Sequence, residues 1–153
     1  MNRTYKFKEK VTRGKPLVDT VSYLLTTFCK FSVCREKVTG TRSVIDGAAL
    51  RADLFVSPNS LWRNGLFIEC KSQNTSGSVH QKLPKLILDV EQGCYPAPLL
   101  IVLSGDYFNK SDVCQHTFEW MKSKVDGRNL VAVFDLQDFM TWCERHQGAP
   151  HVI

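Results

Sequence analysis

Apolar residues recur along the chain with two different periods, and these periods predict its secondary structure. In residues 15–31 the apolar side chains fall at 17, 18, 21, 24, 25 and 28, the spacing of one face of an amphipathic helix. Pro16 suits the first turn of that helix. Further helices are expected over 79–93, where Pro84 marks a kink or a start, over 111–125 with Ser111 or Asp112 as the cap, and over 136–148.

Strands are expected where apolar runs are short and bounded by turn residues. Residues 32–40 suit a short strand or edge hairpin, and 49–56 and 66–72 suit two strands joined by the turn 57–65. The continuous apolar runs 97–105 and 129–136 are typical of strands buried on both faces. Hairpin strands followed by alternating helices and strands predict an α/β fold, with a mixed sheet flanked by helices on both faces.

Composition and charge narrow the class of protein. The 153 residues, 43% hydrophobic and 23% charged, suit a single globular domain, and no window approaches the length of a membrane span. The net charge of +5 lies in residues 1–15, which are basic and lack the apolar run of a signal peptide. We therefore expect a basic arm over 1–15, either a phosphate contact or a solvated tail, before one domain over 16–153.

The cysteines indicate a reducing compartment. None of the six forms a C-x-x-C pair, and several lie in apolar runs: Cys29, Cys34, Cys70, Cys94, Cys114 and Cys143. The histidines are scattered along the chain rather than spaced as zinc ligands: His80, His116, His146 and His151. We expect reduced core thiols, a cytoplasmic protein and no zinc site.

Three charged residues stand on two otherwise apolar strands. Glu69 and Lys71 share one face of their strand, and Asp53 shares a face with Arg51 and Phe55. If the two strands pair, Asp53 and Glu69 meet across the ladder, and their repulsion would be relieved by a divalent cation such as Mg²⁺. The alternative is a set of ordinary salt bridges on a solvent-facing sheet.

The stretch "RADLFV" followed by "FIECKS" resembles the core of the PD-(D/E)xK nuclease superfamily, which includes many restriction endonucleases and Holliday junction resolvases. The resemblance covers about residues 17–135, with Ala52 in place of the family's proline. It implies a restriction-endonuclease-like fold with the core order αβββαβ and extra C-terminal helices. It also implies a metal-dependent DNA endonuclease, restriction-like or homing-like, from a bacterial or phage-infected cell. Such an enzyme would act on double-stranded DNA as a homodimer or higher oligomer.

The same resemblance implies roles for individual residues. Asp53 and Glu69 would bind Mg²⁺, for which Mn²⁺ substitutes, together with the backbone carbonyl of Cys70, and Lys71 would orient or activate the attacking water. Many family members add one more acid near the first helix, and two residues are candidates here: Asp19 and Glu36. The polar residues proposed to contact phosphate or DNA are the following: Arg51, Gln73, Gln81 and Lys82.

Other functions remain compatible with the same sequence. The fold without catalysis would serve as a module that binds nucleic acid or a partner protein, although the intact set of Asp53, Glu69 and Lys71 argues against this. An RNA nuclease is the third possibility, because net charge does not separate DNA from RNA.

Overall fold

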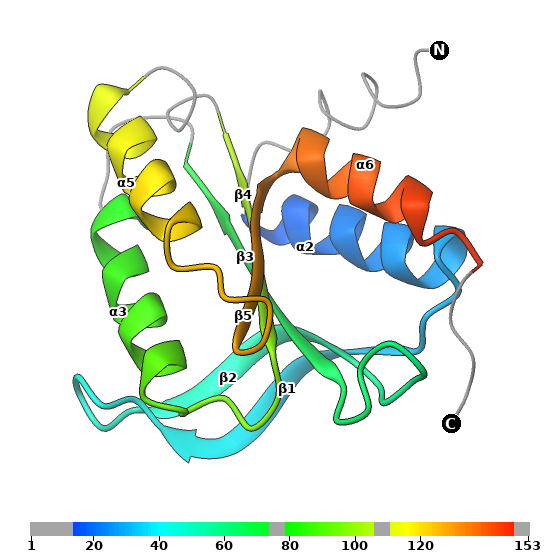
Figure 1. The fold of residues 1–153 in the computed structure, drawn as a ribbon, viewed down its shortest axis with the longest axis horizontal. Coiled ribbons are helices and arrows are strands. Elements are labelled where there is room, and N and C mark those ends of the chain that lie inside the picture. Colours follow the sequence, from blue (N-terminus) through cyan, green and yellow to red (C-terminus); the bar gives the residue numbers. More distant parts are fainter. Residues whose placement is uncertain (1–13, 74–78, 106–110, 149–153) are drawn as a thin grey trace.

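A five-stranded mixed sheet separates two layers of helices (Figure 1). The computed structural model describes residues 14–73, 79–105 and 111–148, and the account below concerns these residues. The strand order is β1-β2-β3-β4-β5, with antiparallel pairing from β1 to β3 and parallel pairing from β3 to β5. The mixed α/β fold predicted from the sequence is confirmed.

The elements follow one another in the expected order of helix, three strands, helix, strand, helix, strand and helix. Their bounds are α2 (Gly14–Tyr23), the π-helical turn η1 (Leu24–Phe28), β1 (Val33–Arg42), β2 (Ala49–Val56), β3 (Leu66–Ser72), α3 (Val79–Glu91), β4 (Leu99–Ser104), α5 (Asp112–Lys122), β5 (Leu130–Asp135) and α6 (Leu136–Arg145). None of the described helices is long and apolar enough to cross a membrane.

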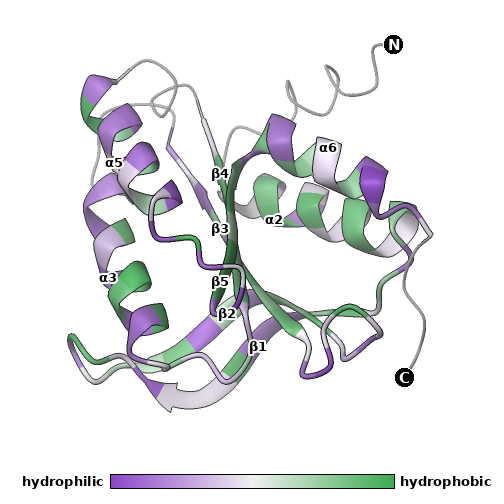
Figure 2. Cartoon of the chain, viewed as in Figure 1, coloured by the Kyte–Doolittle hydropathy of each residue, from purple (hydrophilic) through white to green (hydrophobic). Residues whose placement is uncertain are grey.

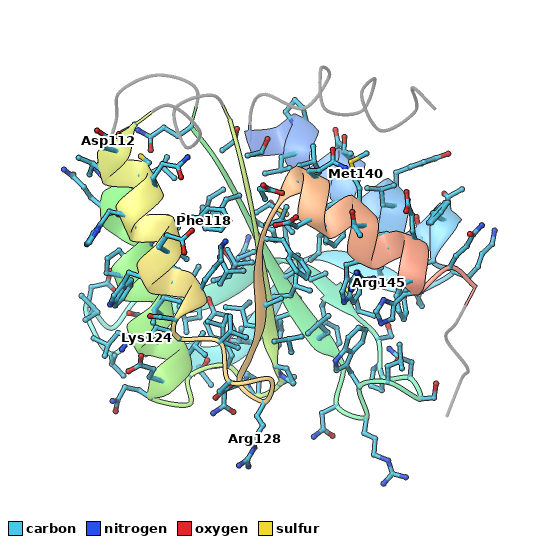
Figure 3. All side chains as sticks on the ribbon, turned by 45° about the horizontal axis from the view of Figure 1, so that its top comes forward. Asp112, Phe118, Lys124, Arg128, Met140 and Arg145 are labelled. Carbon is cyan, nitrogen blue, oxygen red and sulfur yellow. The ribbon has the colours of Figure 1, made fainter. Side chains whose placement is uncertain are left out.

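Apolar side chains form one core on each face of the sheet. Leu17 of α2 and Phe139 of α6 pack on one face, and Ile87 of α3 and Met121 of α5 pack on the other. The central strands are largely hydrophobic, whereas the helices carry both kinds of residue (Figure 2). In Figure 3, Phe118 of α5 points toward the sheet and Arg128 points away from it. The helical faces found by periodicity are therefore the buried ones.

Three local features differ from the sequence expectations. The first helix does not continue to residue 31, because at Leu24 it changes to a π-helical turn in which the amide of Cys29 donates to the Leu24 carbonyl at 2.9 Å. Helix α3 begins at Val79 and runs through Pro84, so this proline is not its start. The structure contains no disulfide among the cysteines and buries five of them, but Cys34 is exposed, so the expectation of a core thiol is wrong there.

The ends of β3 and β4 are held together by a close approach of two backbones. The amide of Gln73, just after β3, donates to the carbonyl of Ser104 at 2.9 Å. Gly105 follows with a φ of +114°, and a Cβ atom at this position would lie 2.2 Å from the Gln73 carbonyl oxygen. Only glycine fits both the backbone angle and the space.

We expect Gly105→Ala to destabilise the protein by about 3 kcal/mol, because the added methyl group must push the ends of β3 and β4 apart. Urea unfolding measures this loss. The matched control is Gly127→Ala, at a φ of +73° with no atom within 4 Å of the added Cβ, which should cost only the backbone strain of about 1 kcal/mol. Equal losses in the two variants would contradict the close approach.

Candidate active site

Strands β2 and β3 separate where the charged residues begin. Their antiparallel ladder runs from the pair of Val56 and Leu66, next to the turn, to the pair of Leu54 and Ile68. It stops there, one residue before Asp53 and Glu69 would pair. Leu54 and Val56 pack in the core under α2 and α6, whereas Ala52 packs in the core under α3 and α5. The regular alternation of side chains along β2 is therefore broken at Asp53, because Ala52 faces one core and Leu54 the other. Beyond this residue β2 no longer pairs with β3, and the two strands form a fork.

Two carboxyl groups bridge the fork. Asp53 Oδ2 accepts a hydrogen bond from the backbone amide of Cys70 at 2.8 Å, and Glu69 Oε1 accepts one from the backbone amide of Asp53 at 3.1 Å. In a continued ladder, a backbone carbonyl of β2 would accept from the Cys70 amide. Each acid instead binds the backbone of the opposite strand. The structure thus brings Asp53 and Glu69 together at the fork, beyond the paired part of the ladder.

An unusual backbone conformation in β1 accompanies this arrangement. Glu36 has a φ of +52°, and β1 pairs with β2 on both sides of Glu36 but not at Glu36 itself, the position opposite Asp53. The amide of Asp53 is therefore not engaged by a regular β1–β2 pair and donates to Glu69. A left-handed residue other than glycine costs about 1–2 kcal/mol, so this irregularity is maintained by its surroundings.

Both candidates for a further acid have their carboxyl groups beside an arginine. The side chain of Glu36 is exposed, and its Oε2 lies 4.0 Å from Arg51 Nη1. Asp19 Oδ1 lies 2.6 Å from Arg35 Nη1, and both side chains are about half exposed. Among the described residues, no group of three or more acids, histidines or cysteines is arranged to hold a metal ion. Of the residues that the structure describes, Asp53 and Glu69 bring their carboxyl groups together at the fork.

Glu69 lies in an environment that disfavours its negative charge. The residue is 5% exposed. Burial, and next the negative charge of Asp53, raise the pKa of Glu69 to about 7, although Lys71 opposes the shift. Lys71 Nζ lies 3.5 Å from Glu69 Oε2, and its own side chain is 38% exposed. The pair is therefore a buried acid with a lysine that reaches solvent, unlike a salt bridge on an open sheet.

The oxygen atoms at the fork suit a hard divalent cation. Asp53 and Glu69 each use one oxygen to accept a backbone amide, and no described residue donates a hydrogen bond to Asp53 Oδ1. The amide of Cys70 faces the fork, and the carbonyl of a strand residue lies on the same side as its amide, so this carbonyl faces the fork too. Two carboxylates and a carbonyl match the ligands that Mg²⁺ prefers. A cation would also relieve the repulsion that raises the Glu69 pKa.

The remaining candidates for contact with phosphate or DNA have different settings. Gln73 is buried, and its Oε1 accepts from the backbone amide of His80 at 3.2 Å. Gln81 and Lys82 are exposed in the first turn of α3, and Arg51 is exposed on β2. Residues 74–78 and 1–13 lie outside the described residues, and residues 14 and 15 open α2.

Tyr95 is a neighbour of the fork that the sequence did not indicate. Its half-buried ring lies 5.8 Å from that of Phe67, which shares a strand face with Glu69. Burial, and next the charges of Glu69, Asp89 and Asp53, raise the pKa of the Tyr95 phenol, so that it keeps its proton. Tyr95 is therefore neutral at physiological pH. Tyr95 lies between a helix and a strand in no periodic pattern, so no sequence signal identified it.

We expect Glu36→Gly to stabilise the protein by about 1 kcal/mol, because glycine adopts the left-handed conformation without strain. Glu36→Ala should give no such gain, since it removes the same carboxyl group and keeps the Cβ atom. Urea unfolding of both variants separates the two effects. A glycine variant less stable than the alanine variant would show that the backbone at this position is not strained.

The stability of the metal-free protein should depend on pH through Glu69. Its pKa is raised from 4.5 to about 7, so the folded state binds the proton more tightly than the unfolded state. The free energy of unfolding should therefore fall as pH rises from about 4.5 to about 7, by up to roughly 3 kcal/mol. Glu69→Gln should remove this slope in urea unfolding, whereas Glu119→Gln on the surface of α5 should keep it. An unchanged slope in Glu69→Gln would contradict the assignment.

A protein-family model matches the chain. The model of the PD-(D/E)XK nuclease superfamily domain matches residues 9–147, which include all three charged residues of the fork and the last part of the basic arm. No curated protein and no solved structure matches the chain. The matched segment covers most of the chain, and the mixed sheet with helices on both faces agrees with it. The chain belongs to the PD-(D/E)XK nuclease superfamily.

Proposed function

We propose that the protein is a metal-dependent endonuclease that hydrolyses phosphodiester bonds of double-stranded DNA at the fork between β2 and β3. The observation that carries the proposal is the interlocked pair of Asp53 and Glu69, with Lys71 Nζ 3.5 Å from Glu69. A buried acid with a raised pKa beside a second acid is a feature of functional sites. Membership of the superfamily supports the proposal, because the resemblance assigns such a pair of acids and a lysine to the nuclease site.

Asp53, Glu69 and the carbonyl of Cys70 would hold Mg²⁺, with Mn²⁺ as a substitute. Bound there, the cation would polarise the phosphate and make its bound water more acidic. The hydrogen bonds from the Cys70 and Asp53 amides fix both carboxyl groups before substrate arrives. Without a cation, Glu69 tends to hold a proton near neutral pH, so cation binding would release that proton.

Lys71 would act on the phosphate or on the attacking water. Its stem leaves β3 on the same face as Glu69, and its partly exposed ammonium is accessible from solvent. A fixed positive charge at this place stabilises the negative charge that develops on the phosphoryl oxygens, which lowers the barrier to hydrolysis. Because Glu69 lies 3.5 Å away, the ammonium is held beside the carboxyl group that would bind the cation.

The contacts to DNA would come from exposed basic and polar residues around the fork. Arg51 lies on β2 two residues before Asp53, Gln81 and Lys82 lie in the first turn of α3, and all three are exposed. The basic arm over 1–15 would add phosphate contacts. Cutting both strands of a duplex with one site per chain requires two chains, so we propose a homodimer on the substrate.

We expect Lys71→Ala to lower kcat for nicking of supercoiled plasmid by roughly 100- to 1,000-fold, because it removes a charge used in the transition state. Folding and Mn²⁺ affinity should change little. A time course of nicking beside a thermal melt measures both. The control is Lys122→Ala on α5, whose ammonium lies 3.5 Å from Glu119 and not at the fork, and which should cut like wild type. Nicking by Lys71→Ala within a few-fold of wild type would refute the catalytic role of Lys71.

A further inference from the structure

The spacing of the two carboxyl groups is not set by strand pairing. The ladder between β2 and β3 ends at Leu54 and Ile68, and among the described residues the hydrogen bonds that join the strands at Asp53 and Glu69 are the two that the acids themselves accept. A metal site requires its ligands to hold their places within about 0.5 Å. The branch of β2 before Leu54 stays paired with β1, and the branch of β3 after Ile68 stays paired with β4. An element that contacts both branches would hold the spacing between them. In Figure 1, α3 extends along the sheet as far as the hairpin of β1 and β2.

A buried acid fastens α3 to the hairpin that leads into Asp53. Asp89 of α3 is 1% exposed, and its Oδ1 accepts from Ser43 Oγ at 3.0 Å and from the amide of Val44 at 2.9 Å. Ser43 Oγ in turn accepts from the amide of Ile45 at 3.1 Å. An acid buried in an apolar core is costly unless it is hydrogen-bonded, so Asp89 has a specific task at this place. That task is to hold the tip of the hairpin.

A buried amide fastens the other end of α3 to β3. Gln73 comes two residues after Lys71, and its Oε1 accepts from the amide of His80 in the first turn of α3 at 3.2 Å. Its backbone is clamped in turn by the hydrogen bond to Ser104 and by the close approach of Gly105. Gln73 therefore connects the strand that carries Glu69 and Lys71 to the start of α3.

We propose that α3 is a strut that sets the width of the fork, and that Asp89 and Gln73 are its positioning residues. Asp89 fixes the branch that leads to Asp53, and Gln73 fixes the branch that carries Glu69. The catalytic consequence rests on the proposed function, because only a metal site needs this spacing. Gln73 then positions α3 and does not contact phosphate. The exposed Gln81 and Lys82, in the first turn of α3, would make the phosphate contacts.

Two pairs of variants test the strut. Asp89→Leu and Gln73→Met remove the acceptor oxygen at similar size, whereas Asp89→Asn and Gln73→Glu keep an oxygen that can accept the same hydrogen bonds. Amide hydrogen exchange, followed by NMR on the full chain without metal, reports the amides of Cys70 and Asp53, which the two carboxyl groups hold. We expect exchange at these amides to accelerate about tenfold or more in the Leu and Met variants. The Asn and Glu variants should stay within a few-fold of wild type.

The metal affinity gives a second reading. Asp89 and Gln73 act through α3 and not directly on the ligands, so we expect the low end of the 10- to 100-fold that outer-shell partners typically contribute: the Leu and Met variants should bind Mn²⁺ about tenfold more weakly. Electron paramagnetic resonance of unbound Mn²⁺ measures this. Phe139→Leu, in the core under α2 and α6, is the control for a general loss of stability and should leave both readings unchanged. If Asp89→Leu does not fold, Ser43→Ala takes its place in the test, because it removes one of the two donors to Asp89.

Amide exchange and Mn²⁺ affinity together distinguish a failure of the strut from a failure of the proposed metal site. Wild-type exchange rates at Cys70 and Asp53 in folded Asp89→Leu and Gln73→Met would overturn the strut, whatever the metal affinity. If exchange at these amides accelerates as much in Phe139→Leu as in the Leu and Met variants, the strut is overturned as well. Faster exchange in the Leu and Met variants alone, with no Mn²⁺ binding by the wild type, would support the strut and refute the metal site of the proposed function.

Discussion

Two hydrogen bonds at the point where β2 leaves β3 hold the site together. Each joins a carboxyl group on one strand to a backbone amide on the other, from Cys70 to Asp53 and from Asp53 to Glu69. They bring two acids close in a place that water scarcely reaches, which raises the Glu69 pKa to about 7. Two acids this close, of which Glu69 is buried, lower the stability of the metal-free fold. A bound divalent cation would attract both carboxylates and so remove their mutual repulsion.

Features away from the fork serve this arrangement. The left-handed backbone of Glu36 leaves the Asp53 amide available to Glu69, and Gly105 allows the close approach that fixes Gln73. Helix α3 is fastened to both branches by hydrogen bonds to buried side chains, Asp89 at one end and Gln73 at the other. Backbone strain and buried polar groups are costly, and they persist where the surrounding structure imposes them. Here they gather around one pair of acids.

Periodicity predicted the order of the elements, and charged residues on apolar strands singled out Asp53, Glu69 and Lys71 as candidates, because both signals are local in sequence. The fork was not predictable, since the point where β2 leaves β3 depends on how both strands twist against two separate cores. Nothing in the strand-like sequence around Glu36 indicates its left-handed φ. Asp89 did leave a sequence signal, because it is the one polar residue in the apolar stretch 86–90, but its partners at Ser43 and Val44 become visible only in the fold.

A crystal of the protein grown with Mn²⁺ tests the central claim most directly. Anomalous scattering at the manganese edge locates the ion without reference to any assumed ligand. A peak within coordination distance of Asp53 Oδ1, a carboxylate oxygen of Glu69 and the Cys70 carbonyl, about 2.0–2.3 Å, is the expected result. No peak at the fork at millimolar Mn²⁺, with Asp53 and Glu69 still bound to each other's strands, would show that the two acids hold the fold together without holding a metal ion.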